Sequence, residues 1–310
     1  MAVKVIKDLC RGCTLCVKAC PFEAIDMVEK KAVINEKCTN CNQCVPVCPF
    51  DAIISEEAEG AVDLSAYKHI WVYAETRNGE LMGVARELIG EGHRLAREVS
   101  GDTKIYALLV GHELDALAQE CFEYGADGAY LIDDPILKNF TTDGYTKAIV
   151  DAVKEYKPEI VIYGATHIGR DLAPRVAARL NTGLTADCTR LDVDIKTYIE
   201  YAKKETTLDV STLDPNDPDK GLKQTRPAFG GNLMATIVCP RTRPQMSTVR
   251  PGVMQKREPV PGAKGEIIRV KPSVTEEDIH TKIVNIVKAA KEMVSLTDAN
   301  GCDTTLTFTI

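Results

Sequence analysis

Beyond about residue 66, the chain alternates short apolar runs with amphipathic segments. Four apolar runs predict strands at residues 69–74, 104–110, 129–132 and 159–163. Between the first three runs, apolar residues recur at helical spacing: Leu81, Val84, Leu88, Ala96 and Val99, and then Leu114, Leu117, Ala118 and Phe122. Alternating strands and helices with short connections predict an α/β fold with a doubly wound parallel sheet. Such sheets bind ligands beyond the carboxyl ends of the strands, where the strand order reverses.

The first 58 residues contain an internal repeat. The stretch Cys10-RGC-TLC-VKAC-PFEAI aligns with Cys38-TNC-NQC-VPVC-PFDAI at an offset of 28 residues, with all four cysteines matched. Each copy reads C-x2-C-x2-C-x3-C-P, the spacing of ferredoxins with two 4Fe-4S clusters, in which the fourth cysteine of each run ligates the other cluster. This predicts a small α+β domain with two 4Fe-4S clusters. One would be held by Cys10, Cys13, Cys16 and Cys48, and the other by Cys38, Cys41, Cys44 and Cys20.

Zinc is the alternative metal for paired cysteines. Zinc takes four ligands in two pairs, which would leave the third cysteine of each run without a role. The other four cysteines show no metal-binding spacing and are interpreted as packing residues: Cys121, Cys188, Cys239 and Cys302.

Composition narrows the class of protein. The chain has 310 residues, 38 Lys plus Arg and 45 Asp plus Glu, giving a net charge of −7. This balance argues against nucleic acid or an anionic membrane as a partner, because both attract basic surfaces. We expect a cytoplasmic protein, since the first residues lack the apolar core of a signal peptide and no apolar stretch is long enough to span a membrane.

The common nucleotide-binding fingerprints are missing. Neither G-x-G-x-x-G after the first predicted strand nor G-x-x-x-x-G-K-[ST] occurs, which argues against a dinucleotide dehydrogenase or a P-loop enzyme. The fourth predicted strand ends instead in Gly164-Ala-Thr, and the turn before the next helix exposes backbone N–H groups that suit an anion. Within this turn, His167 is interpreted as a turn residue, whereas Arg170 either pairs with Asp171 or Asp187 or contacts a flavin.

Three stretches together resemble the alpha subunit of electron-transfer flavoproteins: GATHIGRDLAPRVAARLNTGLTADCTRL, QTRPAFGGNLMATIVCP and RPQMSTVRPGVM. The resemblance covers about residues 66–299. With a ferredoxin module ahead of it, the chain resembles the electron-bifurcating kind, as in lactate dehydrogenase or acyl-CoA (caffeyl-CoA) reductase complexes. It implies a Rossmann-like, adenine-nucleotide-hydrolase-like domain facing a bifurcating FAD that is held mainly by a beta subunit. In that family a second FAD lies in a C-terminal domain of alpha.

The resemblance also implies roles for particular residues. It makes Arg226 the best candidate to face the isoalloxazine ring, with Thr166 and Arg170 as weaker candidates for the same interface. Arg243, Arg250 and the Met-Ser-Thr between them are expected to organise the subunit contact. The implied function is to pass electrons from NADH-reduced FAD to soluble ferredoxin and to a partner flavin dehydrogenase of lactate or acyl-CoA type. No activity is expected of the isolated chain.

The sequence departs from the family after Thr275, where a capping box predicts an amphipathic helix. Its apolar face would consist of Ile279, Ile283, Ile286, Val287, Ala290 and Val294. The motif that opens the family's second FAD domain is not found in the remaining residues, so we expect this chain not to bind the second FAD by itself. The predicted organisation is a ferredoxin domain at 1–58, a linker at 59–66, the flavoprotein domain at 67–272, and a linker helix and tail at 273–310.

Two other functions are considered. An ATP-using sulfur-transfer enzyme would carry an S-G-G-x-D-S loop after the first strand of the large domain, but Glu75-TRNGELMG follows that strand. Alternatively, the large domain is a docking scaffold for the ferredoxin module and binds no flavin.

Overall fold

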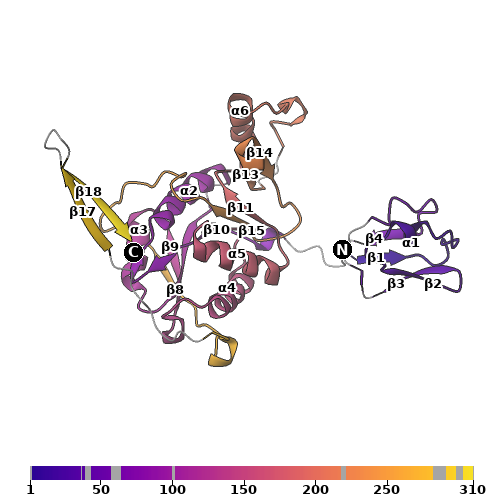
Figure 1. Cartoon of the computed structure of the whole chain (residues 1–310), viewed down its shortest axis with the longest axis horizontal. Helices are drawn as coiled ribbons and strands as arrows, with labels where there is room; N and C mark the ends of the chain where they lie inside the picture. The colour runs from indigo at the N-terminus through magenta and orange to yellow at the C-terminus, as the bar shows by residue number, and fades with distance from the viewer. Residues whose placement is uncertain are drawn as a thin grey trace. The chain divides into compact units, whose positions relative to one another are not determined.

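The computed structural model describes residues 2–35, 37–38, 43–56, 64–99, 102–217, 221–281, 291–297 and 303–309. The chain divides into two compact units, unit 1 (Met1–Tyr67) and unit 2 (Lys68–Ile310), and each is described by itself (Figure 1). In the part of the chain that is described, no helix has both the length and the apolar character needed to cross a membrane.

Unit 1 repeats one small arrangement twice. Strand β2 (Ile25–Val28) pairs antiparallel with β3 (Lys31–Ile34), and β4 (Ile53–Glu56) pairs in the same way with β1 (Ala2–Val5). A short helix, α1 (Leu15–Ala19), lies in the first cysteine run. Because β2 and β4 follow the matching PFEAI and PFDAI stretches, the sequence repeat is also a structural repeat. The core is small, and buried cysteines form part of it.

Unit 2 is built on a seven-stranded sheet in which every neighbouring pair is parallel. The strand order is β11-β15-β10-β5-β8-β9-β16. The strands are β5 (Ile70–Tyr73), β8 (Ile105–Gly111), β9 (Gly128–Asp133), β10 (Ile160–Gly164), β11 (Leu184–Cys188), β15 (Gln245–Val249) and β16 (Glu266–Arg269). The four strands predicted from apolar runs are all present, within one or two residues at each end.

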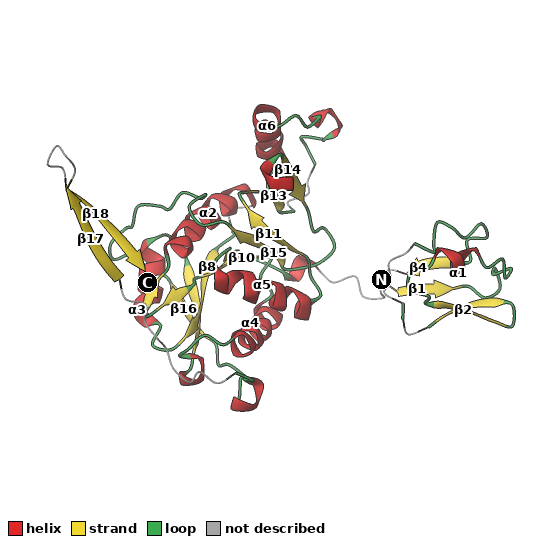
Figure 2. Ribbon diagram, in the orientation of Figure 1, coloured by secondary structure: helices red, strands yellow, loops and turns green. Residues whose placement is uncertain are grey.

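Helices cover both faces of this sheet (Figure 2). On β5, Ile70 and Val72 pack in one core with residues of α2 (Gly83–Val99) and α3 (Asp115–Glu123), whereas Trp71 and Tyr73 pack in a second core with α4 (Thr142–Tyr156) and α5 (His167–Leu180). A strand that is apolar on both faces belongs inside a parallel sheet. The α/β prediction of a doubly wound parallel sheet is therefore confirmed.

The strand order reverses between β5 and β10. From β5 the chain passes through β8 to β9 on one side, and α4 then carries it back to β10 on the other side of β5. The carboxyl ends of β5 and β10 therefore form the crevice in which doubly wound sheets bind ligands.

Smaller elements complete unit 2. A second sheet is antiparallel and has the order β12-β13-β14, and α6 lies between β12 and β13 in the sequence. Strands β6 and β7 form an antiparallel pair directly after β5. Their bounds are β6 (Thr76–Arg77), β7 (Glu80–Leu81), β12 (Arg190–Asp192), α6 (Ile195–Glu205), β13 (Lys223–Ala228) and β14 (Leu233–Ile237). Single 3-10 turns occur at Leu64–Ala66, Pro135–Leu137, Val210–Thr212, Phe229–Gly231 and Glu276–Asp278.

The helix predicted after Thr275 is wrong for the residues that are described. The capping box forms, but it caps only the 3-10 turn Glu276–Asp278, and Ile279 is already extended. Val294, assigned to the helix face, lies in strand β17 (Lys291–Thr297), which pairs antiparallel with β18 (Asp303–Thr309). Ile283, Ile286, Val287 and Ala290 lie outside the described residues. Pairing with the next strand, β18, therefore overrides the helical spacing at 291–297.

The start of α5 lies unusually close to the end of β10. A Cβ added to Gly169 would lie 1.9 Å from the carbonyl oxygen of Gly164, well inside van der Waals contact. Glycine at position 169 therefore lets the first turn of α5 approach the end of β10.

We expect Gly169→Ala to lower the free energy of unfolding of unit 2 by about 1–3 kcal/mol, because backbone has to shift to accommodate the methyl group. Gly83→Ala is the matched control, since a Cβ there meets nothing within 4 Å at the start of α2. The control should be neutral or slightly stabilising. Urea denaturation of both variants measures the difference, and equal stabilities would contradict the close-approach argument.

Candidate cluster and cofactor sites

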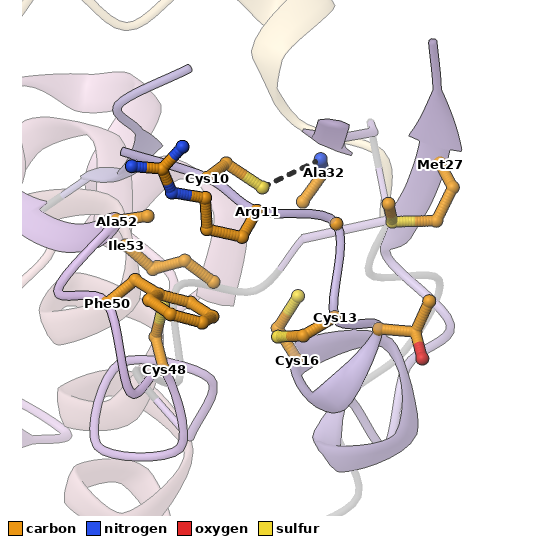
Figure 3. Close-up of a pocket in the computed structure, with 12 residues that line it drawn as sticks. Cys10, Arg11, Cys13, Cys16, Met27, Ala32, Cys48, Phe50, Ala52 and Ile53 are labelled. Carbon is orange, nitrogen blue, oxygen red and sulfur yellow. Dashed lines mark hydrogen bonds between the residues drawn. The ribbon is translucent and has the colours of Figure 1, made fainter. Parts of the chain in front are cut away.

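Four cysteine thiols surround one cavity in unit 1 (Figure 3). Cys10, Cys13, Cys16 and Cys48 line it together with apolar side chains that include Met27 and Phe50. Three of these cysteines come from the first run and the fourth from the second run. The structure thus brings together the set that the crossed spacing predicts for one cluster.

A backbone amide supports one of these sulfurs. The N–H of Ala32 donates to Sγ of Cys10 over 3.4 Å, and this contact is the main reason that the pKa of Cys10 is lowered. The thiolate is the form that binds metal, so the contact favours the ligand state. Burial acts in the opposite direction on Cys16, where it raises the pKa of the thiol.

Gly12 brings the first cysteine loop close to the β2–β3 turn. Its φ of +72° lies in the left-handed region, and an added Cβ would lie 2.4 Å from the carbonyl oxygen of Lys30. The Cys-Arg-Gly-Cys stretch therefore needs glycine at this position for conformation and for space.

The second thiol set is described in part. Cys41 lies outside the described residues, whereas Cys20, Cys38 and Cys44 lie within them. Burial is the main cause that raises the pKa of Cys44, and the charges of Cys20, Cys38 and Cys16 raise it further. Cys20 comes from the first run, and the backbone N–H of Ala24 donates to its sulfur over 3.3 Å.

Within the same described part of the chain, no three His, Cys, Asp or Glu side chains are arranged to hold a single metal ion. Four thiols spaced around a cavity suit a cubane, which accepts one thiolate at each iron. Zinc requires its ligands to converge on one point, at about 2.3 Å from sulfur to metal. Cys10, Cys13, Cys16 and Cys48 therefore fit a cluster.

Crossed ligation can be tested with two double variants. If the cavity holds one cluster, Cys13→Ala with Cys48→Ala disrupts only that cluster and leaves about four irons per chain. Cys13→Ala with Cys20→Ala disrupts both clusters and leaves almost none. Iron and sulfide analysis after anaerobic reconstitution measures both. If Cys13→Ala with Cys20→Ala instead kept more iron than Cys13→Ala with Cys48→Ala, each run would hold its own cluster.

In unit 2, a buried carboxylate lies at the reversal of strand order. Glu75 follows β5 and is fully buried. The Thr166 hydroxyl, at the end of β10, donates to it, and Arg77 lies 3.4 Å away. Thr166 is also the N-cap of α5 and accepts the N–H of Gly169 over 3.0 Å. Thr166 thus joins the two strand ends that form the crevice.

Arg170 is engaged at the same edge of the sheet. One of its guanidinium nitrogens lies 3.1 Å from Asp187 at the end of β11, and its Nε donates to the carbonyl oxygen of Ala165 over 3.0 Å. Asp187 is thus its ion-pair partner, whereas Asp171 pairs with Arg175. His167 is the first residue of α5.

Arg226 lies on β13, opposite Ala235 of β14. Burial raises the pKa of Cys188 to about 12, and the positive charge of Arg226 opposes this shift, which places the guanidinium near the end of β11. Its Nε is buried and has no hydrogen-bond partner. A half-buried cation with an unpaired donor fits an electron-rich ligand such as a reduced flavin.

Arg243 and the Met-Ser-Thr stretch were expected at a subunit contact, and this expectation is wrong. Met246, Ser247 and Thr248 are buried in β15, inside the parallel sheet. The Arg243 side chain is also buried and lies 3.4 Å from Glu159. Arg250 is exposed at the end of the same strand.

An exposed apolar surface on the β13–β14 hairpin escaped the sequence reasoning. This surface, called the hairpin surface below, consists of Phe229, Leu233, Met234, Ile237 and Val238, and Phe229 is 81% exposed. The run Leu-Met-Ala-Thr-Ile-Val carries apolar residues at consecutive positions, a pattern that indicates a strand apolar on both faces. Exposed apolar groups of this kind commonly mark contacts with other proteins.

The family follows from comparison with known proteins. A family model described as "Electron transfer flavoprotein domain" matches residues 70–275, and one described as "4Fe-4S dicluster domain" matches residues 9–52. The chain belongs to the electron transfer flavoprotein family and carries an iron–sulfur domain of the 4Fe-4S dicluster type at its N-terminal side.

Individual relatives agree with this assignment. The chain is 48% identical over 244 residues to "Acryloyl-CoA reductase electron transfer subunit beta" of Anaerotignum propionicum, covering 78% of this chain and 66% of that protein. It is 49% identical over 237 residues to "Electron transfer flavoprotein subunit alpha" of Thermoanaerobacterium thermosaccharolyticum, covering 76% and 64% respectively. "Protein FixB" of Clostridium saccharobutylicum is 44% identical over 238 residues, with coverage of 77% and 64%. The matched region thus spans just under two thirds of each relative.

Proposed function

We propose that this chain is the alpha-type subunit of a flavin-based electron-bifurcating complex, which couples NADH oxidation to reduction of ferredoxin and of a partner dehydrogenase. The observation that carries this proposal is a cavity lined by thiols from both cysteine runs, in a chain of the electron transfer flavoprotein family. Two adjacent cluster sites would make unit 1 a path for single electrons. An acyl-CoA-type partner is favoured over a lactate-type partner, because a relative is named for acryloyl-CoA reductase.

The cysteines of unit 1 would hold the clusters in sites that are partly shielded from water. Each set of four cysteines would supply one thiolate to each iron, and burial of Cys16 and Cys44 would exclude water. The N–H groups of Ala24 and Ala32 would donate to thiolate sulfurs and so stabilise the more negative, reduced state. The many reduced thiols required suit the cytoplasm.

In unit 2, Arg226 would face an FAD held jointly with a beta-type subunit. A bound flavin would supply the exchange between two-electron and one-electron chemistry. The guanidinium of Arg226 would stabilise negative charge on the reduced ring. Thr166 and Arg170 would shape the neighbouring edge, Thr166 by joining the ends of β5 and β10, and Arg170 through Asp187.

The hairpin surface is the part of unit 2 that we propose contacts the beta-type subunit. It lies on the same two strands as Arg226, since Arg226 and Ala235 are register partners. A subunit covering this surface would therefore lie beside the guanidinium, where a flavin shared between two chains has to lie.

The composition of the purified complex tests the proposal. The chain purified anaerobically with its beta-type subunit is expected to contain about eight irons per chain, with FAD bound at the interface of the two subunits. Metal analysis, sulfide assay and flavin absorbance measure these contents. Clusters without FAD would favour the docking scaffold, and zinc or no metal would overturn the cluster assignment.

Arg226→Gln tests the flavin-facing role. We expect NADH-dependent ferredoxin reduction by the complex to fall at least about tenfold, a loss of about 1.4 kcal/mol of stabilisation. The reduction potential of the flavin should fall as well, because the reduced ring loses a positive charge. Arg179→Gln, which removes an exposed arginine from the last turn of α5, is the control. Unchanged activity and potential in Arg226→Gln would remove this residue from the mechanism.

A further inference from the structure

We propose that Lys31 and Arg11 give the cluster site of Cys10, Cys13, Cys16 and Cys48 a higher reduction potential than the second site. The first electron to enter unit 1 then rests at this first site, and the second site is the stronger reductant. The inference rests on the proposed function, in which both thiol sets hold 4Fe-4S clusters.

The strand pairing of the repeat identifies which residues correspond. In β2–β3, Val28 is the register partner of Lys31. In β4–β1, Glu56 is the register partner of Ala2, and Glu56 follows Val28 by the 28-residue offset of the repeat. Lys31 therefore corresponds to Ala2, so a cation at the first site has an uncharged residue as its counterpart.

Lys31 is fixed against the first site. Its Nζ donates to the carbonyl oxygen of Cys10 over 2.6 Å, and its side chain is half-buried. The next residue, Ala32, donates its N–H to the sulfur of the same cysteine. One strand end thus supplies both a positive charge and an amide donor to one ligand.

A second cation accompanies Lys31. Arg11 lines the cavity of the first site and lies directly after Cys10 (Figure 3). In the aligned second run the residue after Cys38 is Thr39, which carries no charge. At both of these positions the cation belongs to the first site, whereas by the same register Lys4 of β1 corresponds to the uncharged Val33.

Electrostatics gives the direction of the effect. Reduction of a cluster adds one negative charge, and a nearby cation stabilises that charge more strongly in a buried site than in water. Net charge, hydrogen bonds to sulfur and exposure set the potentials of iron–sulfur clusters. With one electron in unit 1, the first site holds it. With two electrons, the second site donates at the lower potential, which suits delivery to a low-potential acceptor such as ferredoxin.

A redox titration followed by electron paramagnetic resonance tests this asymmetry in the purified full chain. Wild-type protein should show two separate one-electron steps. Lys31→Gln should lower the reduction potential of the higher step by about 59 mV, which is a tenfold change in the equilibrium constant of a one-electron reduction. Lys30→Gln is the matched control, because it removes the same charge from an exposed side chain of the adjacent turn and should shift the step much less. Lys31→Arg keeps the charge and should preserve the separation.

Two results would overturn the inference: coincident steps in the wild-type chain, or a Lys31→Gln shift no larger than that of Lys30→Gln. Iron analysis of each variant separates these results from failure of the proposed function. A full iron content with no asymmetry rejects only the role of Lys31 and Arg11. A wild-type chain that binds no iron rejects the cluster assignment and this inference with it.

Discussion

The meeting of thiols from both cysteine runs around one cavity is the constraint on which unit 1 depends. Its strands have four residues each and its helix five, so the apolar core is too small to fold firmly by burial alone. Cys10, Cys16 and Cys44 occupy part of that core. If clusters bind as proposed, ligation and folding would become one process, because each cluster would tie the two halves of the repeat together. In the proposed function, the groups that complete the fold are also those that carry the electrons.

Unit 2 places polar groups together at one edge of a parallel sheet. Carboxyl ends of parallel strands share one edge, so Glu75, Thr166 and Asp187 come together although they are far apart in sequence. A buried carboxylate is costly unless it is paired, and Thr166 and Arg77 supply partners for Glu75. The close approach at Gly169 keeps Thr166 in position. These contacts hold the edge together within unit 2 itself, without a partner subunit or cofactor.

The sequence predicted the structure best where a pattern was continuous or repeated. Four long apolar runs predicted four central strands, and the doubled cysteine spacing predicted which thiols lie together. It was misleading where two patterns overlap. Val294 fits a helical face, yet residues 291–297 pair with the next strand, β18, which is rich in threonine and so favours extended structure. Met246 was misjudged because polar neighbours in β15 concealed a strand that lies inside the sheet. Periodicity within one segment carries no information about the segment with which it pairs.

Some cations of this protein are paired with carboxylates and others are not, and this difference bears on function. Carboxylates form ion pairs with Arg94, Arg190 and Arg170, so the positive charge of each is largely neutralised by a fixed negative charge. Lys31 donates to a neutral carbonyl, and Nε of Arg226 has no hydrogen-bond partner. A cation without a fixed counter-charge interacts more strongly with negative charge that arrives later, as it does on reduction of a cofactor. In an electron-transfer protein, such cations are the ones expected beside the redox groups, and in unit 1 Lys31 and Arg11 lie at the first site.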